Sequence, residues 1–192
     1  MFQIEDGRGT GIRAGVTTKY QLLTKAVTTD ALYEAAEQGD AFAVPTDSIF
    51  ISTTTETPIL FIEPHSEMSH INRVRMCAQN ATMFRIYIGD DMTGTIESAG
   101  TVIDPTNMNT GSAKGFDGIA TKGADGLTFG GLKLIGSIRA GAGTNYEQVF
   151  SDSLMISSHA KFLLTAQLMT AGSSEVCSSV VIYNHAAMVG GH

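Results

Sequence analysis

The first candidate for chemistry is a glycine-rich stretch near the start of the chain. Residues 9–14 read Gly-Thr-Gly-Ile-Arg-Ala, which fits the G-x-G-x-x-G/A spacing of a pyrophosphate-binding loop. Such a loop needs a buried strand before it and a helix after it, because the helix N-terminus faces the phosphates. Here only eight residues precede Gly9, and the sequence Val16-Thr17-Thr18 opens a helix poorly. The context therefore favours an extended arm over a nucleotide-binding loop.

Histidine and acidic residues are the next candidates, for metal binding or acid–base chemistry. The five histidines, at positions 65, 70, 159, 185 and 192, form no i, i+4 pair of the kind that binds zinc from a helix. Asp90-Asp91 and Asp117 could hold a cation, but aspartate beside glycine is more typical of turns. The chain contains no Gly-x-Ser-x-Gly and no Cys-x-x-Cys motif. We therefore expect no catalytic residue, no metal site and no cofactor.

The two cysteines are interpreted as structural residues. Cys77 and Cys177 both lie in apolar, strand-like runs, and this setting predicts buried free thiols. No secretory leader is recognisable at the start, and no apolar run approaches the length of a membrane span. We expect a soluble protein that is made in a cytoplasm and does not bind membranes.

Composition and charge narrow the class of protein. The 192 residues, 43% apolar and 16% charged with 21 glycines, predict a globular domain built from short strands and turns. A net charge of −7 speaks against nucleic acid as a partner. Residues 1–25 nevertheless hold four basic against two acidic side chains, and no basic residue follows until Arg73. This asymmetry indicates an arm that docks elsewhere, although chance clustering on a solvated surface remains the alternative.

Periodicity predicts one short helix followed by many strands. The helix is expected over residues 29–38, with Thr29 or Asp30 as its N-cap and Gly39 as its end, and a short strand over residues 19–27 precedes it. A long polar loop is expected over residues 104–126, which hold five glycines. The alternating runs predict strands over residues 48–54, 58–63, 69–77, 82–89, 127–139, 148–157, 161–170 and 175–185.

Strands at this spacing predict a mainly β fold, a jelly-roll-like β-sandwich with an N-terminal extended arm and one short helix. The expected organisation has three parts. Residues 1–45 form the arm, the short strand and the helix, residues 46–185 form the sandwich body, and residues 186–192 form a C-terminal tail.

Four stretches resemble small virion structural proteins of tailed bacteriophages, of the capsid cement or decoration type. The opening GIRAGVTTKYQLLTKAVTTDALYEAAEQGDAFAVPT resembles their glycine turn, short strand, helix and first sheet strand. INRVRMC resembles an early strand, DPTNMNTGSAKG their Asn-rich loop, and SSEVCSSVVIYNH their last strand. The resemblance covers most of the chain but includes no catalytic signature.

The resemblance implies a non-enzymatic protein on the outer surface of a phage head, made in the host bacterial cytoplasm. Its implied partners are the major capsid protein and other copies of itself, as a homotrimer that bridges capsomers. The side chains expected to bind the partner lie in the arm: Arg8, Ile12, Arg13 and Lys19, with Gly7, Gly9 and Gly11 giving the arm conformational freedom. An extended arm of this kind can complete the open sheet edge of a neighbour.

Two alternatives remain open at this point. In one, the protein belongs to a head fibre, tail or baseplate, and the loop at residues 104–126 contacts a host receptor or glycan. In the other, it is a small enzyme or ligand-binding jelly roll that holds a metal through two or three histidines.

Overall fold

The computed structural model describes residues 15–16, 22–23, 30–65 and 68–184, and the chain divides into two units, residues 1–30 and 31–192. In the first unit, β1 (Gly15–Val16) and β2 (Leu22–Leu23) form an antiparallel pair. β2 falls within the strand predicted for residues 19–27, whose other residues lie outside the described ones. The second unit is described below by itself.

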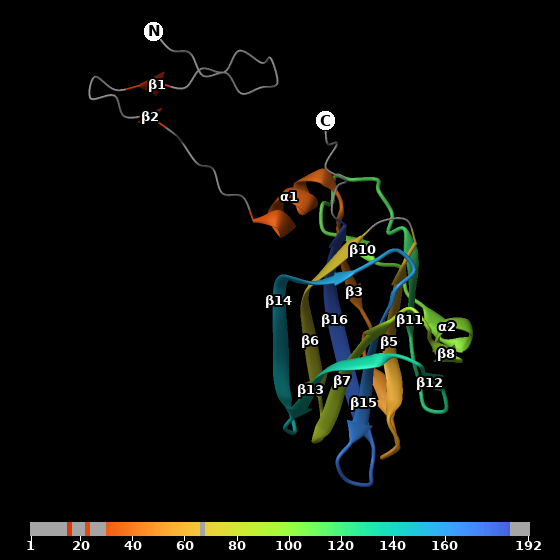
Figure 1. The fold of residues 1–192 in the computed structure, drawn as a ribbon. Helices are drawn as coiled ribbons and strands as arrows, with labels where there is room; N and C mark the ends of the chain where they lie inside the picture. The colour runs from red at the N-terminus through yellow and green to blue at the C-terminus, as the bar shows by residue number, and fades with distance from the viewer. Residues whose placement is uncertain (1–14, 17–21, 24–29, 66–67, 185–192) are drawn as a thin grey trace. The chain divides into compact units, whose positions relative to one another are not determined.

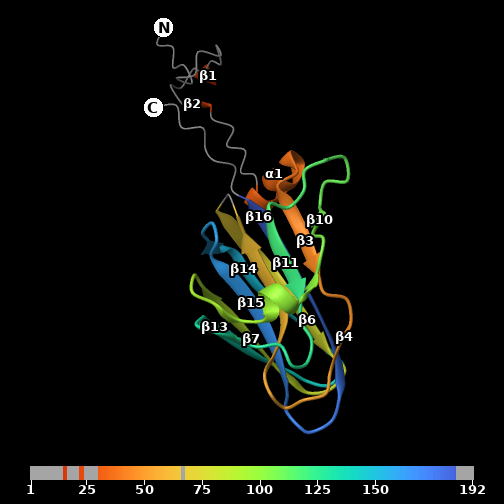
Figure 2. The ribbon, with the colours of Figure 1, turned by 90° about the vertical axis from the view of Figure 1, so that its right-hand side faces the viewer.

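Two antiparallel sheets pack face to face in the second unit, which confirms the mainly β, sandwich-like prediction (Figures 1 and 2). The first sheet has the order β10-β3-β16-β6-β14, with β4 also paired to β16. Its strands are β3 (Ala41–Pro45), β4 (Ile49–Ile51), β6 (Ser69–Ala78), β10 (Thr106–Asn107), β14 (Thr144–Ile156) and β16 (Ser174–Asn184). β3 thus belongs to a sheet of the sandwich, although the expected domain boundary at residue 45 leaves it outside the body.

The second sheet has the order β13-β7-β15-β5-β11-β9. Its strands are β5 (Thr57–Pro64), β7 (Thr82–Gly89), β9 (Thr101–Val102), β11 (Gly118–Lys122), β13 (Lys133–Ala140) and β15 (Lys161–Leu168). The second unit also contains a small antiparallel pair, β8 (Thr93–Gly94) with β12 (Phe129–Gly130). The two helices in its described residues are α1 (Ala31–Gln38) and the one-turn helix α2 (Ile96–Ala99).

The main core lies between the two sheets, because alternate side chains of each strand point inward. Phe84 and Ile86 on β7, with Phe162 and Leu164 on β15, are almost completely buried there. Facing strands of the first sheet contribute Ile71, Val74, Met76, Val180 and Ile182. Each such side chain contributes roughly 1.5–3 kcal/mol when it is fully buried, so this layer dominates the stability of the fold.

The outer faces of both sheets are also partly covered. On the first sheet, α1 (Ala31–Gln38) packs Ala35 against Ala41 and Tyr183, and Gly39, with a φ of +76°, ends the helix as the sequence predicts. On the second sheet, Ile96 of α2 covers Phe61 and Leu163. This second cluster explains why every residue of β5 is buried: the strand has apolar neighbours on both faces.

The segment over residues 104–126 is not one long loop, and that expectation is wrong in part. β10 pairs with β3 and β11 pairs with β5, so the segment extends both sheets. Asn107 at the end of β10 donates to the carbonyl of Gly39 at 2.8 Å, and Asn109 donates to the carbonyl of Glu37 at 3.0 Å. These amides satisfy carbonyls at the end of α1 that have no partner within the helix. The polar, glycine-rich composition therefore reflects a helix cap and two short strands.

The expectation of free thiols is also wrong. Cys77 on β6 and Cys177 on β16 lie directly opposite each other, with a Cα–Cα distance of 5.2 Å, and form a disulfide. Both side chains point to the outer face of the first sheet and are half-buried. A separation of one hundred positions hides this pairing from the sequence, because only the sheet register makes the two residues neighbours.

We predict that the double substitution Cys77→Ser and Cys177→Ser lowers the free energy of unfolding by about 2–5 kcal/mol, because a disulfide that closes a long loop restricts the unfolded chain. Urea denaturation under oxidising conditions measures the change. In the presence of a reducing agent, the wild-type protein and the variant should unfold at the same urea concentration. Identical unfolding under oxidising conditions would show that the bond contributes nothing.

Candidate functional site

The arm residues expected to bind a partner, Arg8, Ile12, Arg13 and Lys19, all lie outside the described residues. The structure therefore neither places them nor brings them together. The described body offers three features with functional potential: a polar network on the second sheet, a cluster around a buried glutamate, and an open flank of the sandwich. We take them in turn.

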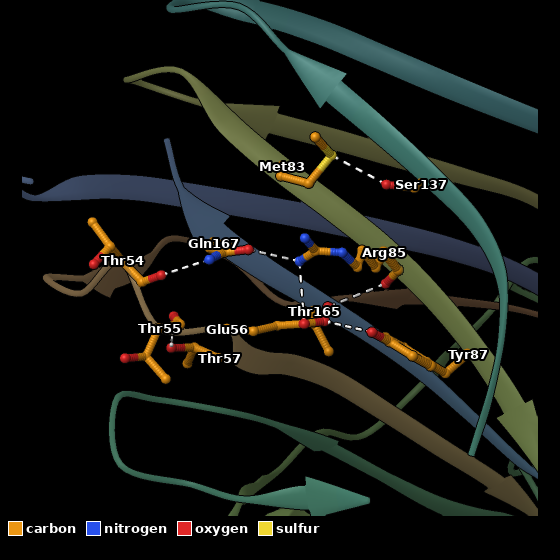
Figure 3. A network of polar contacts seen from close by, with 10 residues as sticks. All are labelled: Thr54, Thr55, Glu56, Thr57, Met83, Arg85, Tyr87, Ser137, Thr165 and Gln167. Carbon is orange, nitrogen blue, oxygen red and sulfur yellow. Dashed lines mark hydrogen bonds and ion pairs between the residues drawn. The ribbon is translucent and has the colours of Figure 1, made fainter. Parts of the chain in front are cut away.

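The polar network joins β5, β7 and β15 on the outer face of the second sheet (Figure 3). Glu56, just before β5, accepts hydrogen bonds from the hydroxyls of Tyr87, at 2.9 Å, and Thr165. Arg85 forms an ion pair with the other carboxylate oxygen of Glu56 at 3.1 Å and donates to Gln167 at 2.8 Å. Both oxygens of Glu56 are thus engaged, which suits a tie between strands better than a reacting group.

The same network changes the ionisation of its tyrosine. Burial, followed by the hydrogen bond to Glu56 and the charge of that carboxylate, raises the pKa of Tyr87 to about 12. Each of these causes disfavours the phenolate, because it would be poorly solvated and next to a negative charge. Tyr87 therefore stays a hydrogen-bond donor across the physiological pH range.

A second polar cluster surrounds Glu63 at the end of β5. Its side chain is only 9% exposed; one oxygen lies 3.4 Å from Nδ1 of His159, and the other lies 3.7 Å from Nζ of Lys161. The ring of His159 stacks on His65 with 5.5 Å between centroids. The fold thus brings together two histidines that are 94 positions apart in the sequence. Across residues 30–65 and 68–184, however, no group of three or more His, Cys, Asp or Glu side chains has the arrangement of a metal site.

The third feature is an open flank formed by β13 and β14. Each is the last strand of its sheet, and a short turn at residues 141–143 connects them, so the two free edges lie on the same side of the sandwich (Figures 1 and 2). Of the eleven exposed large apolar side chains in the described residues, five belong to these two strands: Leu134, Ile135, Tyr146, Val149 and Met155. A long edge strand with exposed apolar side chains is a template for pairing with another chain.

The flank is hollowed at the end away from its turn. Met155 and Ile156 of β14 line one side of this hollow, and Lys133 at the start of β13 lines the other. Asp90 and Asp91, which follow β7, are exposed at its rim. Among the described residues, no cation lies within ion-pair distance of either carboxylate; the nearby Lys161 ammonium donates to the backbone carbonyl of Asp90 and pairs with Glu63 instead. An apolar floor with unpaired carboxylates at the rim suits a ligand that carries both an apolar and a basic group.

Sequence reasoning did not find the flank. The run over residues 133–140 alternates like any half-buried strand, and nothing local distinguishes an edge strand from a central one. The available signal is weak: Lys133 and Arg139 are the type of basic side chain that commonly marks an edge. The sequence offers Asp90-Asp91 as a possible cation site or a turn, and the structure places both residues at the hollow that Met155 also lines.

Comparisons with known proteins add no relative: no family model, no curated protein and no solved structure matches the chain. In the part of the chain that the structure describes, neither helix has the length and apolar character required to cross a membrane.

The raised pKa of Tyr87 leads to a prediction about alkaline stability. The folded pKa, about 12, exceeds the ordinary value of 10.0, so the stabilisation from this group is complete below pH 10 and is lost as the pH rises toward 12. Tyr87→Phe should therefore make the free energy of unfolding fall less steeply between pH 10 and 12 than in the wild type. Urea denaturation at several pH values measures this slope. Tyr146→Phe, at an exposed tyrosine of β14, is the control and should match the wild type; equal slopes for all three proteins would contradict the assignment.

Proposed function

We propose that this chain is a non-enzymatic structural protein of a tailed-bacteriophage virion, of the cement or decoration type. It binds the outer surface of the capsid, contacts the major capsid protein and stabilises the head by bridging capsomers. The observation that carries this proposal is the open flank, where two long free edges and five exposed apolar side chains lie together on one side of the sandwich. Such a surface is typical of a protein that works in an assembly.

We also propose that the body is a jelly roll. The eight main strands, numbered in chain order, are β3, β5, β6, β7, β13, β14, β15 and β16. In these numbers, the main strands of the first sheet have the order 1-8-3-6, and those of the second sheet have the order 5-4-7-2. These orders support two interlocked Greek keys, the arrangement of a jelly roll. The small elements between β7 and β13 are then an insertion between two neighbouring strands.

The proposed assembly is a homotrimer. A head-to-tail contact between different surfaces of identical chains closes into a ring when the rotation allows it. In a trimer, the flank of one copy meets a different part of the next copy. Weak contacts of the three copies with the capsid act together, so the bound trimer dissociates much more slowly than a single copy would.

The disulfide is consistent with a location outside the cell. Disulfides are rare in the cytoplasm, where thiols are kept reduced, and they persist in oxidising surroundings. A virion protein is made in the host cytoplasm and then works outside it. The Cys77–Cys177 pair, half-buried and already aligned by the sheet register, would close after release.

The alternative location, in a head fibre, tail or baseplate, receives less support. That alternative assigns contact with a host receptor or glycan to the segment at residues 104–126. Asn107 and Asn109 in that segment are engaged with carbonyls at the end of α1, and Lys114 forms an ion pair with Asp40 at 2.8 Å. These side chains therefore already have an intramolecular role.

We predict that deleting residues 1–18 leaves a folded body that no longer binds heads, because the basic arm supplies contacts that the acidic body lacks. Circular dichroism checks the fold, and co-sedimentation with heads that lack the protein measures occupancy. Wild-type occupancy of the truncated protein would refute the role of the arm.

A second prediction concerns the flank. Val149→Asp together with Met155→Asp places charges where we expect an apolar contact, and should reduce self-association at least tenfold, a cost of about 1.4 kcal/mol. Sedimentation velocity over a range of concentrations measures the change. Val102→Asp, at an exposed apolar side chain on β9 at the other end of the second sheet, is the matched control and should associate normally. Unchanged association of the flank variant would exclude this surface from the assembly.

A further inference from the structure

We infer that the hollow at the end of the open flank of one copy receives the N-terminal arm of a neighbouring copy, with Ile12 and Arg13 as the residues that enter it. This inference names the partner of the flank and rests on the proposed function, because it requires copies assembled side by side. It concerns contact between two copies of this chain, whereas the cement function concerns contact with the capsid.

Charge is the first argument for this occupant. Residues 1–25 carry four basic and two acidic side chains, and the remainder of the chain carries eight basic and seventeen acidic ones. The arm is therefore the basic segment of an acidic protein. At the hollow, Asp90 and Asp91 outnumber Lys133, so the rim has a net negative charge. A short basic segment is attracted to such a site, and the attraction weakens as salt screens it.

The chemistry of the hollow is the second argument. Its floor includes Ile88, Met155 and Ile156, so a purely charged ligand would leave apolar surface in contact with water. The arm offers an isoleucine next to an arginine at positions 12 and 13. In an extended chain, neighbouring side chains point in opposite directions, and a slight twist of the backbone lets Ile12 face the floor while Arg13 reaches the rim. Guanidinium groups bind carboxylates through paired hydrogen bonds, which suits two adjacent aspartates.

Chain length is the third argument. The β1–β2 pair turns the chain back on itself, so Ile12 lies three residues before one end of this pair, and α1 begins eight residues after the other end. These eleven residues extend up to about 40 Å in total, which allows Ile12 to contact a copy that packs alongside.

The test is cross-linking between two differently tagged proteins, one carrying Ile12→Cys and the other Met155→Cys. These substitutions leave every charge of the arm and the hollow in place, and the native cysteines are already paired. The two proteins are mixed, oxidised gently and analysed on a non-reducing gel, both free in solution and bound to heads. Because each protein carries only one new cysteine, a mixed dimer reports contact between copies.

We expect at least five times more mixed dimer than in the matched control, Ile12→Cys with Val102→Cys on the exposed edge strand β9. Asp90→Asn with Asp91→Asn in the Met155→Cys protein should reduce the yield several-fold, while Lys133→Gln should not reduce it. Raising the salt concentration to about 0.5 M should also reduce the yield, because charges are then screened within a few ångströms. This salt measurement tests the charge argument without altering the turn at Asp90.

Equal yields for the flank and control pairs, in solution and on heads, would overturn the inference. It would also be overturned if a doubly substituted chain, Ile12→Cys with Met155→Cys, closes on itself while the mixture gives no mixed dimer, since the arm would then fold back onto its own flank. The two proposals fail separately. Mixed dimers without binding to heads would refute the cement function alone, and binding to heads without mixed dimers would show that the arm contacts the capsid protein instead.

Discussion

The pairing of the last strand, β16, with strands from the first half of the chain is the constraint on which the structure depends. β16 lies between β3 and β6 and also pairs with β4, so it joins residues more than one hundred positions apart. Its inward side chains, such as Val180 and Ile182, complete the floor of the main core. The Cys77–Cys177 disulfide fixes the same pairing covalently. Without β16 the first sheet separates into two parts, and the apolar face of the second sheet loses the inward side chains of its central facing strand.

The two sheets differ in how their outer faces are protected. α1 covers Tyr183 on the first sheet, and α2 with its neighbouring segment covers Phe61 and Leu163 on the second. Beyond these covers, the network around Glu56 satisfies the polar groups that neighbouring strands expose. The flank is different, because β13 and β14 retain free edges with exposed apolar side chains. The opposite sheet ends, β9 and β10, are only two residues long, whereas β13 and β14 are long, and a partner chain is the simplest physical explanation for their exposed apolar side chains.

In the proposed assembly, the flank and the arm complement each other. Residues 1–25 carry four basic and two acidic side chains, whereas the flank combines apolar surface, free backbone groups and two unpaired carboxylates at one end. In general, a segment that becomes ordered on binding gives up conformational entropy, so each of its contacts is individually weak. In the proposed assembly, many copies on a regular lattice compensate for such weakness. The same logic applies whether an arm contacts the capsid protein or a neighbouring copy, which is why the two proposals are tested separately.

The sequence by itself determined the β class, the helix ending at Gly39 and most strands, because these depend on local periodicity and on glycine at a positive φ. The strands within residues 104–126 were missed, since β10 and β11 are short, lie among glycine and polar residues, and exist by pairing with β3 and β5. Local pattern likewise gave no sign of the Cys77–Cys177 bond, of the contact between His65 and His159, or of the free edges of β13 and β14. Only the tertiary structure decided these features, because they depend on which distant strands become neighbours, and that order is set by the packing of the whole core rather than by any short stretch of residues.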